Sequence, residues 1–136
     1  MEWLAGMRIS AARMNDNTAE EETTAGLVMA SGWSENNFQG RKLNGVTTVS
    51  MSLNRTGGTL TSSSNGSIPV TLVATLPIGW RPLDTVIENF DKSGVADGSV
   101  TILPDGTCTI KSMSPTATIA VNNDITFFAQ WISENS

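Results

Sequence analysis

The C-terminal half of this chain consists of short apolar segments that alternate with polar residues and end at turn-forming residues. The segment 70–76 alternates in this way and runs into a proline-bounded corner, 77–82, that contains Trp80. Several more short segments follow, each bounded by glycine, proline, asparagine or aspartate. A period of two is the pattern of a strand with one buried face, and these residues favour turns. The pattern therefore predicts a series of short strands.

The composition points to the same fold class. Only 15% of the 136 residues are charged, and serine, threonine and asparagine are abundant. Threonine favours strands and the others favour turns, whereas helical surfaces are rich in glutamate, lysine and alanine. We count seven to nine strands, with the clearest alternation at 45–54 and a hairpin signal at 104–106. An antiparallel β-sandwich, all-β and similar to a jelly-roll head, is the expected fold.

The last predicted strand, 125–132, is apolar on both faces. Such a strand is expected at the centre of a sandwich or under a subunit contact. A chain of this size has little material to cover both faces by itself. We therefore expect an oligomer.

The first 24 residues differ from the rest. They contain a possible short helix at 9–16 and an acidic run, Glu20–Glu22, interpreted as a solvated linker. We divide the chain into an anchoring arm, 1–24, and a β-sandwich head domain, 25–136. The expected anchors are the apolar residues Trp3, Leu4, Met7 and Ile9. The N-terminus has neither the pattern of a signal peptide nor that of a membrane span, so we expect no membrane partner.

The side chains offer little catalytic chemistry. The chain has no histidine, no tyrosine and a single cysteine, Cys108, interpreted as a small buried side chain. Triads that need histidine and zinc sites made of cysteine and histidine are therefore absent. The net charge is −5 and the eight basic residues are scattered, which argues against nucleic-acid binding. We expect a protein that is not an enzyme and has no cofactor and no metal.

Two alternative functions would depend on carboxylate groups, and the sequence supports them less well than a role without catalysis or metal. Asp84 with Glu88, or Asp91 with Asp97, could serve a glycoside hydrolase. Asp91, Asp97 and Asp105 could instead bind calcium from loops, although their spacing is not that of an EF-hand.

The large aromatic residues divide into two groups. Trp33 lies in a polar stretch that resembles a loop, which makes it the candidate for saccharide contact. Residues of the second group are expected in the core or in an assembly contact: Trp80, Phe127 and Trp131.

The order of motifs in the second half resembles that of the C-terminal head domains of bacteriophage tail fibres and baseplate proteins. It contains Leu76-Pro77, Gly79-Trp80-Arg81-Pro82, Val100-Thr101-Ile102, Asp105-Gly106 and a final aromatic strand. Residues 3–15 are similar to the openings of small virion proteins of phages and prophages of actinobacteria.

The resemblance implies a homotrimeric receptor-binding head in a virion, in contact with other phage proteins and with host cell-wall polysaccharide. It would be made in the host cytoplasm. The alternative within the virion class is a decoration protein that stabilises a capsid or tail without host recognition, and a small carbohydrate-active enzyme is a remote alternative.

Overall fold

The structure is a computed structural model that describes residues 20–133, and all of its regular elements are strands. Within those residues there is accordingly no helix that could cross a membrane. The strands are β1 (Glu21–Thr23), β2 (Val28–Met29), β3 (Trp33–Leu43), β4 (Val46–Arg55), β5 (Leu60–Thr61), β6 (Ser67–Thr75), β7 (Val86–Lys92), β8 (Ala96–Ile102), β9 (Thr107–Met113), β10 (Thr118–Ile119) and β11 (Asp124–Ile132).

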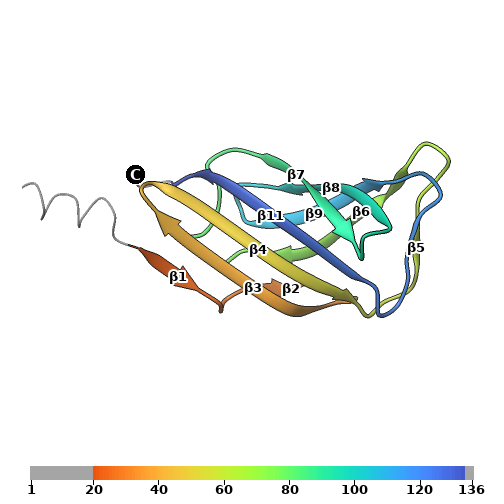
Figure 1. Ribbon diagram of the computed structural model, residues 1–136, viewed down its shortest axis with the longest axis horizontal. Helices are drawn as coiled ribbons and strands as arrows, with labels where there is room; N and C mark the ends of the chain where they lie inside the picture. The colour runs from red at the N-terminus through yellow and green to blue at the C-terminus, as the bar shows by residue number, and fades with distance from the viewer. Residues whose placement is uncertain (1–19, 134–136) are drawn as a thin grey trace, which may run out of the picture.

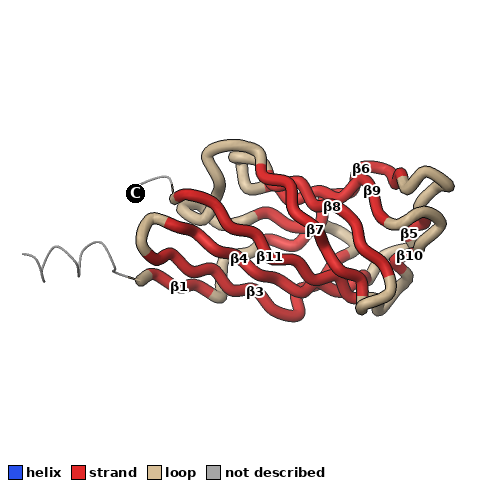
Figure 2. Tube along the Cα trace, turned by 45° about the horizontal axis from the view of Figure 1, so that its top comes forward, coloured by secondary structure: helices blue, strands red, loops and turns tan. Residues whose placement is uncertain are grey.

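Nine strands form one antiparallel sheet in the order β1-β3-β4-β11-β7-β8-β9-β6-β2. The sheet curls into two layers, one made of β1, β3, β4 and β11 and the other of β7, β8, β9, β6 and β2 (Figures 1 and 2). β5 and β10 form a separate two-stranded ribbon at one end (Figure 2). The predicted all-β antiparallel fold is confirmed.

The inward side chains of both layers meet in one hydrophobic core. In β4, inward and outward residues alternate: Val49, Met51 and Leu53 are buried, whereas Thr48, Ser50 and Ser52 point outward. This is the alternation that the sequence predicted at 45–54. Other fully buried large side chains are Phe38, Val73, Leu76, Phe90, Val100, Ile102, Ile110, Ile119 and Ile125.

Two hairpin turns follow from local sequence. Asn44 and Gly45 join β3 to β4 as a two-residue loop, and both have positive φ angles of 54° and 78°. Such a loop matches the twist of the strands and favours asparagine followed by glycine. The predicted hairpin at 104–106 is also confirmed, since it joins β8 to β9 and Asp105 accepts hydrogen bonds from the backbone and hydroxyl of Thr107.

The N-terminal part of the described chain covers both edges of the sheet. β1 pairs with β3 at one edge, and β2 pairs with β6 at the other. The acidic run was interpreted as a solvated linker, and this is wrong for Glu21 and Glu22, which lie in β1. Their backbone groups complete the hydrogen bonding of β3, and Glu20 forms an ion pair with Arg41. The expected arm therefore overlaps the sheet, and its anchors Trp3, Leu4, Met7 and Ile9 lie outside the described residues.

Truncation should locate the start of the folded unit. A variant that begins at residue 20 keeps β1 and should melt close to the full chain. A variant that begins at residue 25 loses β1 and exposes the backbone of β3 from Gly40 to Lys42. An unpaired edge promotes aggregation, so this variant should melt at a lower temperature and form aggregates. Thermal unfolding followed by circular dichroism measures the difference, and equal melting temperatures would show that β1 is dispensable.

The tryptophans should differ in their contribution to stability. Trp33 is only 4% exposed, and its ring lies 4.9 Å from the guanidinium carbon of Arg55. Trp33→Ala should therefore cost about 3–5 kcal/mol. Trp131 is half-buried at the rim of the core, so Trp131→Ala should cost less. Urea unfolding of both variants tests this order, and a larger loss for Trp131→Ala would contradict it.

Candidate functional site

Trp33 does not lie in a loop, and the prediction that it faces a ligand is wrong. It is the first residue of β3, and its side chain belongs to the inward-facing set. Arg55 covers the ring and donates a hydrogen bond from Nε to the carbonyl of Gly58. A ring enclosed in this way has no free face for a sugar to stack on.

The other aromatic candidates occupy the core and its rim. Phe127 is 3% exposed and lies in the core. The ring of Trp80 packs against Gly40 of β3, and the Lys42 ammonium lies 4.7 Å from its centroid. Trp80 and Trp131 are both half-buried.

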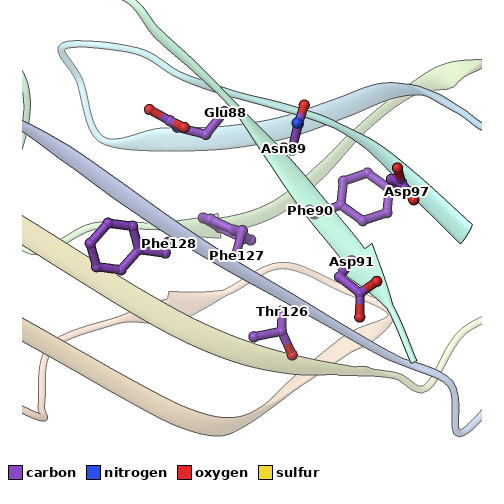
Figure 3. A pocket seen from close by; sticks show the side chains of 8 residues that line it. All are labelled: Glu88, Asn89, Phe90, Asp91, Asp97, Thr126, Phe127 and Phe128. Atoms are coloured by element: carbon purple, nitrogen blue, oxygen red, sulfur yellow. The ribbon is translucent and has the colours of Figure 1, made fainter. Parts of the chain in front are cut away.

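An open groove lies instead where β7 and β11 separate. The two strands pair only from Ile125 to Phe127 of β11, opposite Phe90 to Lys92 of β7. Beyond the pair Phe127–Phe90 they diverge, and a groove of about 420 Å³ lies between them. Its lining residues are Glu88, Asn89, Phe90, Asp91, Asp97, Thr126, Phe127 and Phe128 (Figure 3).

The floor of the groove is aromatic and rigidly packed. Phe90 and Phe127 are 1% and 3% exposed, and they face each other across the last paired position. Gly98 of β8 lies against the Phe90 ring, and a Cβ at this position would overlap the ring edge. The glycine therefore leaves the space that Phe90 needs in order to pack beneath the groove.

The rim of the groove combines one exposed aromatic ring with polar groups. Phe128 is 56% exposed, and Figure 3 shows its ring and the Glu88 carboxylate on the side where the strands diverge. Asp91 and Thr126 lie where the strands converge (Figure 3). An exposed aromatic face beside carboxylate, amide and hydroxyl groups suits a ligand that has both C–H faces and hydroxyl groups.

The carboxylates of the groove also have structural roles. Asp91 and Asp97 lie directly opposite each other across β7 and β8, and Asp91 Oδ2 accepts a hydrogen bond from the Gly94 backbone at 2.9 Å. Asp105 lies beyond the far end of β8, in the next hairpin, so the predicted calcium trio is not brought together. Across residues 20–133, no three histidine, cysteine or acidic side chains are close enough to hold a metal ion.

The outward face of β3, β4 and β11 continues from this groove. On β11 it presents Thr126, Phe128 and Gln130, because Ile125, Phe127 and Ala129 are buried. A second hollow of about 310 Å³ lies on this face at the other end of β11. It is lined by Arg41, Leu43, Asn44, Val46, Thr48 and Gln130.

A small polar network fixes the start of β11 to this face. Asp124 accepts hydrogen bonds from the side-chain amides of Asn54 at 2.8 Å and Asn36 at 2.9 Å. These two bonds stabilise the ionised carboxylate and hold its pKa below the usual value. Asn36 lies at a bulge in β3, between Glu35 and Asn37, so the network joins the bulge to two strands.

No protein-family model matches the sequence, and no curated protein sequence matches it. Among solved structures, the chain is similar to the crystal structure of the receptor binding protein (gp15) of Listeria phage PSA. The TM-score is 0.60 at 12% identity, and the match covers 95% of this chain and 75% of that chain. At this identity the likeness shows the fold alone. It gives no support to the predicted actinobacterial source, which stays a prediction.

Sequence reasoning missed the groove because it treated 125–132 as one doubly apolar strand. The position of β11 between β4 and β7 confirms that the strand is central. Its outward face, however, holds only Phe128 and Ile132 as large apolar residues, and these are 56% and 72% exposed. The signal that could have found the site is that Phe128 shares a face with the polar residues Thr126 and Gln130.

Proposed function

We propose that this chain is a bacteriophage virion protein that recognises the host surface by binding a cell-wall saccharide in the groove between β7 and β11. The observation that carries the proposal is the exposed Phe128 ring beside carboxylate, amide and hydroxyl groups, on a fold similar to that of a phage receptor binding protein. A sugar ring offers an apolar C–H face to the aromatic ring and hydroxyl groups to the polar side chains. No catalytic step is part of this function.

Binding to purified polysaccharides tests the proposal. On an array of bacterial wall and capsular polysaccharides, the full chain should bind at least one member. Phe128→Ala should weaken this binding by about tenfold, which corresponds to about 1.4 kcal/mol. Because Phe128 is largely exposed, the variant should keep its melting temperature.

Val121→Ala is the matched control, since Val121 is 50% exposed but lies in the turn before β11 and does not line the groove. It should bind as the unmodified chain does. If Phe128→Ala and Val121→Ala bound equally well, the groove would not be the binding site. Absence of binding to every polysaccharide would refute saccharide recognition and favour the decoration alternative.

We also propose that the chain assembles as a homotrimer and that residues before β1 attach it to other virion proteins. Support for self-association comes from the outward face of β6–β9, where Ile87, Thr101, Thr109 and Leu72 are aligned across four strands. Ile87 and Leu72 are 66% and 41% exposed, and Val70 is 72% exposed. The aligned row itself carries no charge, and exposed aliphatic residues of this kind are typical of subunit contacts.

Light scattering measures the assembly directly. The full chain should show three times the 14.4 kDa mass of one copy. Ile87→Lys should reduce this mass by placing a charge in the contact, whereas Val121→Lys should not. A single-copy mass for the full chain at micromolar concentration would contradict the trimer.

A further inference from the structure

The groove between β7 and β11 and the second hollow lie on one continuous face. Thr126 and Phe128 line the groove, and Gln130, two residues further along β11, lines the second hollow. All three belong to the outward set of the same strand. The two depressions are therefore successive positions along one strand and not sites on different sides of the molecule.

The surface between them is made of hydroxyl and amide groups. β4 places Ser52 opposite Thr126, Ser50 opposite Phe128 and Thr48 opposite Gln130. Apart from Phe128, these residues carry uncharged polar side chains, and on β3 Gln39 lies opposite Ser50. Such groups can both donate and accept hydrogen bonds, as the hydroxyl groups of a sugar require.

The hydrogen bonds among these side chains are long. Thr126 and Ser52 are 3.4 Å apart, and Gln130 Nε2 lies 3.3 Å from Thr48 Oγ1. Bonds of this length at an exposed surface are weak, so exchanging them for bonds to a ligand costs little. This face differs in that respect from the start of β11, where Asp124 forms two short bonds.

The length of the face limits the size of its ligand. Gln130 lies four residue steps beyond Thr126, which corresponds to about 13 Å along an extended strand. This span is longer than a single sugar ring. A ligand that contacts both depressions must therefore consist of several linked sugars.

The charges at the first depression restrict the ligand further. Glu88, Asp91 and Asp97 line the groove, and its lining includes no basic side chain. In the second hollow the charged side chain is Arg41, which is paired with Glu20. Phosphate or carboxylate groups of a ligand would be repelled at the groove. A neutral polymer meets no such penalty.

From these observations we infer that the two depressions are the ends of one elongated binding platform, and that its ligand is a neutral polysaccharide strand lying along β11. This inference rests on the proposed saccharide recognition and adds the length and charge of the ligand. The Phe128 ring contacts a sugar at the groove end of the platform. Gln130 and Thr48 contact a sugar further along the same strand.

Oligosaccharides of graded length provide the test. A polysaccharide bound on the array is cut into fragments of one to eight sugars, and their affinities for the full chain are measured by calorimetry. Affinity should rise at least tenfold from one sugar to the length that spans both depressions and then level off. Phe128→Ala should weaken all binding fragments, whereas Gln130→Ala should weaken the long ones severalfold and leave the short ones unchanged. Val121→Ala should change neither.

Other outcomes separate the two hypotheses. A single sugar that binds as tightly as the long fragments, or long fragments that are insensitive to Gln130→Ala, would overturn the platform while leaving saccharide recognition intact. A preference for phosphate-bearing or uronic-acid polymers over neutral ones would overturn the assignment of charge. Failure to bind any polysaccharide would overturn the proposed function together with this inference.

Discussion

The short pairing between β11 and β7 is the constraint on which the rest of the structure depends. β11 pairs with β4 from Asp124 to Ile132, but with β7 only from Ile125 to Phe127. This brief junction lets one continuous sheet turn from the first layer into the second, so that both layers bury their apolar faces in a common core. Because strand twist separates β7 from β11 beyond Phe90 and Phe127, the same junction also produces the groove. The junction between β7 and β11 therefore produces both the common core and the candidate site.

The opposite side of the sandwich is closed in a different way. The segment that contains β1 and β2 supplies one strand to each layer. β1 pairs with β3 at the edge of the first layer, and β2 pairs with β6 at the edge of the second. Exposed sheet edges promote association, and covering them with two short strands limits the backbone left unpaired. The solvent-facing surfaces can then carry function. One presents hydroxyl and amide groups around Phe128, and the other presents aliphatic residues suited to contact between copies.

The proposed saccharide binding requires neither a catalytic group nor a metal. An aromatic ring and weakly paired hydroxyl and amide groups lie on β4 and β11, whose inward sides are packed in the core, and the carboxylates come from the neighbouring strands β7 and β8. Such a layer can bind a ligand without rearrangement, which lowers the entropic cost of binding. The groove and the second hollow differ in two respects, since the groove contains aromatic rings and carboxylates and the second hollow contains neither.

The sequence alone determined the fold class, the alternating core positions of β4 and the hairpin at 104–106, because strand periodicity and turn chemistry are local properties. It also held an unused signal. Asn44-Gly45 directly before the clearest strand indicates a preceding partner strand, which would have placed Trp33 in β3 and not in a loop. Tertiary structure alone decided that Glu21 and Glu22 complete a sheet edge and that Phe128 borders an open groove. These features depend on where the sheet curls and where two strands diverge, which follows from contacts between residues far apart in the chain and cannot be read from any one segment.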